Sequence, residues 1–467
     1  MTASTTPSVI TLDLPHLGNR CHLVHDGARA LVVDPPRDLA AVEGAAEEAQ
    51  LEIAAVADTH VHNDYLSGAL GLARRHGADY LLAADEPVEF ERVGVRGGDV
   101  LEVGRLSVRV IDTPGHTRHH QAFLASYGDG PGALFSGGSL LHGTVGRTDL
   151  VDPALTATLA AAQWQSARTL DELPPATRLH PTHGFGSFCA GGVTAGPDAG
   201  TPTVADQRAT NPVLQLDRDP FVEALVAGFG PYPAYYRHMG PLNRAGSGRR
   251  RPRPSRRLAL EELLDARDRG AWLVDLRPRR SYAAAHLPGT LGIEYGAQFA
   301  TYVGWLVPWG AELVLLTPSG VDPAPALTDL AAIGIEGVAT FALDGAAHGD
   351  QPTGRYRVAD WADWVSGSGG DPDLRARRVL LDVRQRDEHD AGHLRGSVHI
   401  ALQDLPARIA QVPPGEVWVH CRSGFRAGIA AALLARAGRS VVHLDDDWQR
   451  VAGSAVPRPR PAARPAG

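Results

Sequence analysis

The sequence contains no lysine, so all 45 of its basic residues are arginines. Cysteine is almost as scarce, because only Cys21, Cys189 and Cys421 occur, far apart along the chain. Three distant cysteines cannot supply the disulfide framework on which small secreted folds depend. We therefore expect free thiols and a reducing compartment, the cytoplasm.

Long apolar runs are also missing. No stretch of about 18 apolar residues occurs, which excludes a membrane-spanning helix from the expected elements. The N-terminal segment MTASTTPSVITLDLP has neither a basic start nor an apolar core, so it does not read as a secretory signal. The net charge of -8 provides no overall attraction to nucleic acid or to an anionic membrane. We expect neither as a partner.

At 467 residues the chain is too long for one hydrophobic core. Two segments lack apolar periodicity and mark breaks between domains: NRAGSGRRRPRPSRR and WVSGSGGDPDLRARR. Apolar strands that alternate with helical patterns predict an α/β fold. The predicted division is a first domain at 1–242, a linker at 243–257, a second domain at 258–358, a third domain at 374–456 and a disordered tail at 457–467.

The second and third domains look like copies of one unit. GAWLVDLRPRRSYAAAHLPGTLGI starts at Gly270, and RRVLLDVRQRDEHDAGHLRGSVHI starts at Arg377. Each has an apolar run, an Asp-x-Arg, a short helical stretch and a His-Leu before a glycine turn. The repeat of about 100 residues predicts two doubly wound domains with parallel sheets.

The segment VWVHCRSGFRAGIAAALLARAG places Cys421 between a predicted strand and a predicted helix. The loop N–H groups, the helix N-terminus and Arg426 would favour the thiolate and could hold a terminal sulfur or an oxyanion. Arg422 is the other loop arginine. The alternative is a buried structural cysteine.

This segment resembles a rhodanese, or sulfurtransferase, domain over about 80 residues, through LLDVRQRDEHDAGHLRGSVHI and CRSGFR. The resemblance implies that Cys421 carries a persulfide. LDDDWQ departs from the family, and its extra carboxylates could alter acceptor preference. The first copy has Thr317 where the cysteine should be, so we expect it to be inactive and to dock or shape the other domains.

Histidines gather in the loops that follow predicted strands of the first domain. His60, His62 and Asp64 lie on one turn in ADTHVHNDYLSG, His116 follows in TPGHT, and His183 follows in PTHGFGSFC. Four such histidines predict a metal site, and imidazole suits zinc, iron, copper and nickel alike. Four further histidines are expected at the surface or behind the ligands: His76, His119, His120 and His142.

Four segments resemble the motifs of the metallo-β-lactamase fold and occur in the same order: THVHNDYLSG, TPGHT, GRTDL and PTHGFGSFC. The resemblance covers about 240 residues and implies an αβ/βα sandwich. Within that superfamily the pattern is most similar to the persulfide dioxygenases, which use one Fe(II). It implies His60 and His116 as iron ligands and a carboxylate at the position of Gly138.

Two residues depart from the superfamily. Tyr65 stands where dinuclear hydrolases have a histidine, and Gly138 stands where they have a bridging aspartate. Both losses argue against a two-metal hydrolase. The group that fills the third position of a single-metal site stays open among His62, Asp64, Asp149 and water. Cys189 is expected either at the substrate pocket, together with Tyr65 and Gly138, or in the core.

The leading hypothesis is an enzyme that oxidises a low-molecular-weight thiol persulfide with O₂ to sulfite. Through Cys421 it would also move sulfane sulfur between persulfide, sulfite and thiosulfate. A zinc-dependent thioesterase with an attached sulfurtransferase is the first alternative. A metal domain that has become a binding module beside an active rhodanese domain is the second. The carrier thiol and the formation of a homo-oligomer stay open.

Overall fold

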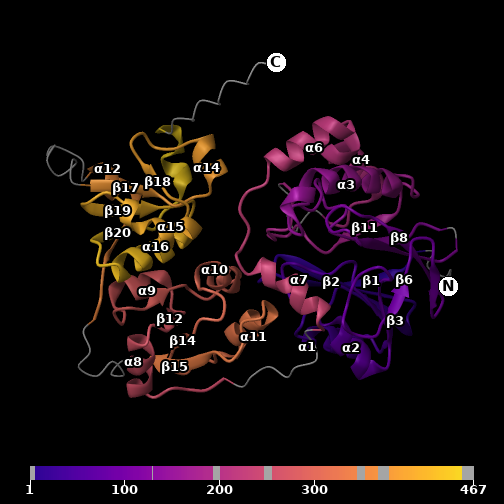
Figure 1. Cartoon of the computed structure of the whole chain (residues 1–467), viewed down its shortest axis with the longest axis horizontal. Coiled ribbons are helices and arrows are strands. Elements are labelled where there is room, and N and C mark those ends of the chain that lie inside the picture. Colours follow the sequence, from indigo (N-terminus) through magenta and orange to yellow (C-terminus); the bar gives the residue numbers. More distant parts are fainter. Residues whose placement is uncertain are drawn as a thin grey trace. The chain divides into compact units, whose positions relative to one another are not determined.

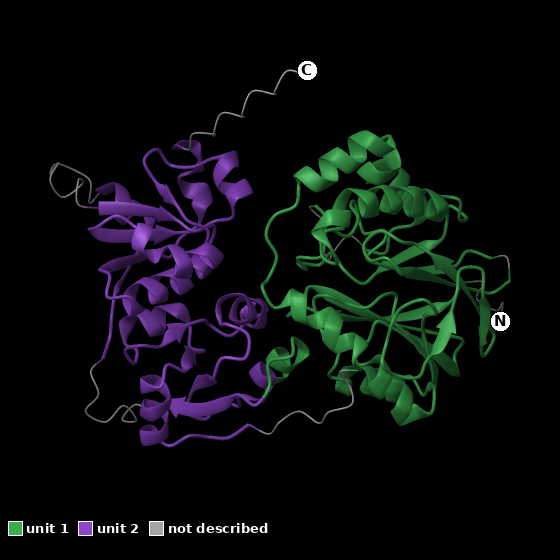
Figure 2. Ribbon diagram, viewed as in Figure 1, with its two compact units in different colours: residues 1–253, 328–336 green, residues 254–327, 337–467 purple. Residues whose placement is uncertain are grey.

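A computed structural model describes residues 6–128, 130–192, 200–246, 255–343, 353–366 and 378–454 (Figure 1). The chain divides into two compact units (Figure 2). The first contains Met1–Arg253 and Thr328–Glu336, and the second contains Pro254–Leu327 and Gly337–Gly467. The expected tail, the middle of the expected linker and most of the second break lie outside the described residues.

Two β-sheets form the centre of the first unit, in the orders β1-β2-β3-β4-β5-β6 and β11-β10-β9-β8-β7. Their facing sides bury apolar residues such as Val33 and Leu81 from one sheet and Val108 and Phe135 from the other. The strands are β1 (Ser8–Leu14), β2 (Asn19–His25), β3 (Arg29–Val33), β4 (Glu52–Ala57), β5 (Asp79–Ala83), β6 (Val93–Val95), β7 (Val100–Val103), β8 (Leu106–Asp112), β9 (Gln121–Ser126), β10 (Ala133–Gly137) and β11 (Arg178–Pro181).

Helices cover the outer faces of both sheets. Ala160 and Ala167 of one helix pack with Leu124 and Leu134 on the outer side of the second sheet. The result is the αβ/βα sandwich that the sequence predicted. The helices of this unit are α1 (Ala40–Glu48), α2 (Ala69–His76), α3 (Thr156–Asp171), α4 (Val204–Thr210), α5 (Pro212–Gln215), α6 (Arg218–Ala227) and α7 (Tyr236–Arg244).

The second unit contains two parallel sheets, in the orders β13-β12-β14-β15 and β16-β20-β19-β17-β18. The shared order β13-β12-β14-β15 and β18-β17-β19-β20 reflects the internal repeat. The strands are β12 (Trp272–Asp275), β13 (Leu291–Gly292), β14 (Leu313–Pro318), β15 (Ala339–Leu343), β16 (Arg357–Ala359), β17 (Arg378–Asp382), β18 (Val398–His399), β19 (Glu416–His420) and β20 (Val441–Leu444). The helices are α8 (Leu260–Asp268), α9 (Arg279–Ala284), α10 (Phe299–Leu306), α12 (Trp361–Ser366), α14 (Arg386–Ala391), α15 (Leu405–Arg408) and α16 (Phe425–Arg436). Helix α11 (Ala324–Ala332) begins in this unit, and its residues from Thr328 on are counted with the first unit.

Strand β16 differs from the predicted division. The predicted second domain ends at residue 358, and the predicted third domain begins at residue 374. In the structure Arg357, Val358 and Ala359 pair with β20 and so complete the sheet of the third domain. A strand of three residues is too short to show a reliable period, so the sequence pattern does not predict it.

Among the described residues, no helix is both long and apolar enough to cross a membrane. The three cysteines are free and buried.

Candidate functional site

Three histidine side chains meet at one edge of the first unit. His60 follows β4, His116 follows β8 and His183 follows β11. The Nε2 atoms of His60 and His183 lie 3.3 Å apart. The His116 ring centroid is 4.8 Å from that of His60 and 5.2 Å from that of His183. One ring nitrogen of each residue lies within 4.8 Å of the other two, so the three imidazoles can hold one metal ion.

The second nitrogen of these imidazoles is held by a neighbour. His116 Nδ1 lies 2.7 Å from the carbonyl oxygen of Arg147, and His183 Nδ1 lies 2.9 Å from Oδ1 of Asn19. His116 Nε2 is buried and has no hydrogen-bond partner among the described residues. Partners behind a ring orient it and direct the other nitrogen to a metal, and a buried unpartnered nitrogen is costly without one.

The protonation of the cluster also suits a metal. Burial, together with the neighbouring imidazoles, lowers the pKa of His60 far below its usual value. Burial and the proximity of His183 lower the pKa of His116 to about 3. Neutral imidazoles keep the lone pairs that metal ions require. The residues present therefore fit a transition-metal ion.

His62 faces a different set of partners. Its Nε2 lies 3.2 Å from Oδ1 of Asp34 and 3.0 Å from the Tyr65 hydroxyl, which donates to the Asp34 carbonyl. The Tyr65 side chain is fully buried. The structure thus places Tyr65 in the core behind His62, whereas the sequence analysis expected it at a substrate pocket.

Asp64 is a further neighbour of the His183 ring. Its Oδ2 accepts from Asn19 at 2.8 Å and from Ser187 at 3.2 Å, and its Oδ1 has no partner among the described residues. Although burial opposes ionisation, the neighbouring His183 holds the pKa of the Asp64 carboxyl below its usual range. His62, Asp64 and His183 form a second group that could hold a metal, and it shares His183 with the first.

Gly138 does not leave an open space. Its N–H donates to Nε2 of His120 at 3.0 Å, and its carbonyl accepts from Gly146 at 2.8 Å. A Cβ at this position would lie 2.2 Å from Cδ2 of His116. The ring of His116 thus occupies the volume that a side chain would need, and the third imidazole of the group is that of His183.

Asp149 and Cys189 take different positions. Both carboxylate oxygens of Asp149 accept from the Arg147 guanidinium, at 2.7 and 2.8 Å, so Asp149 supports the loop whose carbonyl holds His116. Cys189 is buried, and burial and the proximity of Asp64 raise its pKa well above the usual value. It is a neutral thiol close to the second group.

We expect Gly138→Asp to weaken the site and not to restore a ligand. The new Cβ must displace the His116 imidazole, and overpacking of this kind costs about 1–3 kcal/mol. Metal content and the midpoint of thermal unfolding should both fall. Gly44→Asp is the matched control, because a Cβ at that exposed helical position meets nothing within 4 Å. Higher metal content in Gly138→Asp would contradict this expectation.

Sequence reasoning missed the residues that support the ligands. Asn19 contacts both His183 and Asp64, and Asp34 accepts from Thr59, His62 and Thr182. A signal for Asp34 exists in VVDPP, where an aspartate ends an apolar strand; its φ of 54° is unusual for a residue other than glycine. Asn19 carries no comparable signal.

Cys421 occupies the turn between β19 and α16 and is 1% exposed. The turn ends at Gly424, whose φ is 87° and where a Cβ would lie 2.1 Å from Oδ1 of Asp445. Glycine is therefore required at this point. Helix α16 starts at Phe425 and directs the positive end of its dipole toward the turn, which suits a thiolate or a persulfide.

The two loop arginines differ. Both terminal nitrogens of Arg426 donate to the Glu388 carboxylate, at 2.5 and 2.8 Å. Although burial opposes it, this pairing and the proximity of Cys421 raise the pKa of Arg426. The side chain of Arg422 is exposed, and its carbonyl accepts from Trp448 at 2.8 Å. Arg422 is thus the arginine free to meet an incoming anion.

The first repeat contributes to this site from outside the third domain. Arg279 and Arg280 donate to opposite oxygens of Asp445, at 2.8 and 2.5 Å. The ring of Tyr302 on α10 lies 5.5 Å from that of Phe425 in an edge-to-face arrangement. Leu316 pairs with Asp275 as His420 pairs with Asp382, so the buried Thr317 takes the place of Cys421 in the first repeat. Asp445, the first of the three carboxylates in LDDDWQ, is therefore paired with the two arginines of the first repeat.

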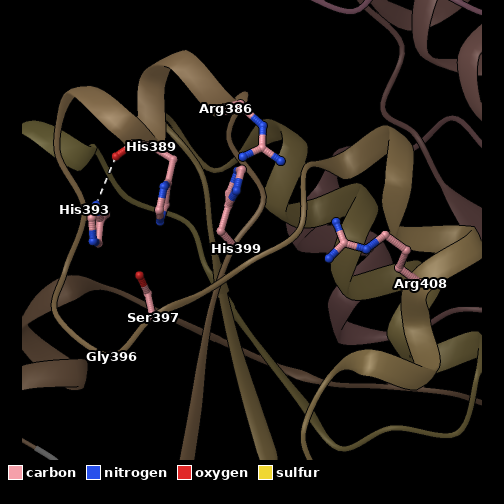
Figure 3. A pocket seen from close by; sticks show the side chains of 7 residues that line it. All are labelled: Arg386, His389, His393, Gly396, Ser397, His399 and Arg408. Carbon is pink, nitrogen blue, oxygen red and sulfur yellow. Dashed lines mark hydrogen bonds between the residues drawn. The ribbon is translucent and has the colours of Figure 1, made fainter. Parts of the chain in front are cut away.

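A separate cavity of about 350 Å³ lies in the third domain (Figure 3). The ring of His389 stacks on His393 at 4.1 Å and on His399 at 4.2 Å. Arg386 and Arg408 also line the cavity, and Figure 3 shows them to the right of His389 and His393. The described lining contains no carboxylate, so the cavity suits a small anion.

Known proteins resemble different parts of the chain. The rhodanese-like domain family matches residues 362–453. A hydroxyacylglutathione hydrolase of Cupriavidus taiwanensis is 31% identical over 240 residues, which cover 44% of this chain and 86% of that protein. A hydroxyacylglutathione hydrolase of Albidiferax ferrireducens is 34% identical over 167 residues, which cover 36% of this chain and only 62% of that protein.

Among solved structures, a metallo-β-lactamase from Staphylococcus aureus superposes with a TM-score of 0.63 at 23% identity. The superposition covers 72% of this chain and 100% of that chain, and it supports the fold. The chain therefore belongs, through its first unit, to the metallo-β-lactamase-fold family that includes the hydroxyacylglutathione hydrolases, and it carries a rhodanese-like domain at its C-terminal end.

Proposed function

We propose that the chain is a sulfur-handling enzyme with two activities. The first unit oxidises a low-molecular-weight thiol persulfide to sulfite: RSSH + O₂ + H₂O gives RSH, SO₃²⁻ and two protons. The Cys421 site transfers sulfane sulfur: RSSH and SO₃²⁻ give RSH and S₂O₃²⁻. The product of the first reaction is the acceptor of the second, which gives the fusion a chemical purpose.

The observation that carries this proposal is that one ring nitrogen each of His60, His116 and His183 can hold one ion, beside a second group that shares His183. Tyr65 fixes His62 from behind, and Gly138 supplies no bridging carboxylate. Two-metal hydrolysis depends on such a bridge. A bound Fe(II) would supply the redox chemistry with O₂, and three ring nitrogens leave further positions around the ion for ligands. Zinc is the alternative metal.

The chain's own residues have defined tasks in each step. The carbonyl of Arg147 and the amide of Asn19 orient two of the imidazoles. The buried edge limits the access of water to the three rings. In the transfer reaction the Cys421 sulfur attacks the terminal sulfur of RSSH, releases RSH and holds that sulfur as a persulfide. The positive charge of Arg422 then attracts sulfite, and sulfite accepts the outer sulfur of the Cys421 persulfide to form thiosulfate.

The names of the relatives favour a second candidate, thioester hydrolysis with zinc. One assay separates the two. The full chain, loaded with iron or with zinc, is given glutathione persulfide or a hydroxyacylglutathione, while O₂, sulfite and free thiol are measured. We expect O₂ uptake and sulfite only with iron and persulfide. No O₂ uptake by iron-loaded protein would refute the proposal, and thioester cleavage by zinc-loaded protein would establish the alternative. Absence of bound metal would leave the first unit as a binding module.

A further inference from the structure

A cavity of about 560 Å³ opens in the second unit at the opposite end of α16 from Cys421. Helix α16 has 12 residues, so its two ends are about 18 Å apart. This distance separates the cavity from the sulfurtransferase site. Its volume lies in the range of about 300–1,000 Å³ that is typical of small-molecule sites.

Four arginines line this cavity: Arg355, Arg357, Arg436 and Arg439. They come from two different segments, the approach to β16 and the end of α16 with the turn that follows. The chain as a whole is acidic, with a net charge of -8, so this concentration is a local feature. A helix C-terminus attracts cations and would account for Arg436 alone, but not for Arg355 and Arg357.

Most of this positive charge is not compensated within the described residues. Arg355 has no ion pair there, Arg436 stacks on the Trp272 ring at 4.5 Å, and Arg439 donates to the carbonyls of Val412 and Pro413. Arg357 is the one of the four that forms an ion pair with a described carboxylate, Asp363, at 3.3 Å. Guanidinium groups that share one cavity repel each other, and a multiply charged anion would relieve that repulsion.

The remaining lining supports a built site. Glu416 is the carboxylate among the described lining residues, and it already accepts from Trp418 at 2.7 Å and lies 3.5 Å from Arg378. The hydroxyl of Tyr356 is buried and has no hydrogen-bond partner among the described residues. Reciprocal backbone bonds of 2.8 and 3.0 Å between His286 and Gly354 fix one wall.

We propose that this cavity binds a nucleotide-sized anion that carries more than one phosphate group. The phosphates contact the guanidinium groups of the four arginines that line the cavity. The site is independent of the metal cluster and of Cys421, and it joins residues 286–290 of the first repeat to the second repeat. A ligand that binds there stabilises the second unit by mass action.

The test uses the full chain with ADP, inorganic phosphate and adenosine as separate probes in calorimetry and thermal unfolding. We expect ADP to bind and to raise the unfolding midpoint, and both other probes to bind at least about 10-fold more weakly. The double variant Arg355→Ala/Arg436→Ala should weaken ADP binding by at least about 10-fold. Both side chains are exposed, so the variant should fold, and its unliganded unfolding midpoint checks this.

Arg395→Ala is the matched control, because Arg395 is an exposed arginine of the same unit outside the cavity lining. Three results would overturn the proposal: no binding of ADP, equal binding of inorganic phosphate, or ADP binding that the double variant leaves unchanged. Sulfur transfer through Cys421 should be the same in the double variant and the control.

Discussion

Replacement of Cys421 by serine is expected to reduce sulfur transfer to below about one part in a thousand of the original rate. A hydroxyl cannot hold sulfane sulfur as a persulfide, and the substitution changes only one atom at a site that is 1% exposed. Thiosulfate formation from glutathione persulfide and sulfite measures the effect. Metal content and O₂ uptake should stay at their original values, because His60, His116 and His183 lie in the other unit.

Cys189→Ser is the matched control for this experiment. It also removes a buried thiol, but one in the first unit. Transfer should continue in this control. Transfer that survives Cys421→Ser and disappears with Cys189→Ser would move the sulfur carrier to the first unit and contradict the assignment.

Replacement of His116 by alanine is expected to remove the metal from the first unit. The loss of one of three imidazoles should lower metal affinity by more than about 100-fold, since even the partners behind a ligand are worth about 10–100-fold. Elemental analysis of the purified protein should show metal content close to zero, and O₂ uptake with persulfide should vanish. Transfer through Cys421 should persist.

His119→Ala is the control, because His119 is a half-buried neighbour in the same loop and is not a member of the described metal-holding groups. Metal content equal to that of the original protein in His116→Ala would point to the group of His62, Asp64 and His183. Asp64→Asn would then remove the metal, while His116→Ala would not.

The sequence indicated the histidines of the candidate metal site but not how they group in space. His60, His116 and His183 were visible because each follows an apolar strand, and strand ends share an edge of a sheet. The choice of His183 as the third group depends on the distance between two loops more than a hundred residues apart. From the sequence, Tyr65 is only the replacement of a histidine that dinuclear hydrolases have. The fold shows in addition that its hydroxyl faces His62.

The turn around Cys421 shows the same limit to what the sequence alone can predict. CRSGFR predicted the turn around Cys421 because its residues are contiguous. The pairing of Asp445 with Arg279 and Arg280 joins segments about 165 residues apart, and no local pattern encodes such a contact. The surroundings of Gly138 could not be predicted for a similar reason, since the ring of His116 fills the volume that a side chain there would need.

Strand β16 determines how the rhodanese-like domain can be isolated. Arg357–Ala359 cover one side of β20, and the stretch lies before residue 362, where the rhodanese-like match begins. A fragment that starts at residue 374 would leave the backbone N–H and C=O groups of β20 open along a sheet margin. Exposed strand edges pair with strands of other chains, so we expect this fragment to self-associate. A fragment that starts before Arg357 keeps β16, which covers that edge and prevents such pairing.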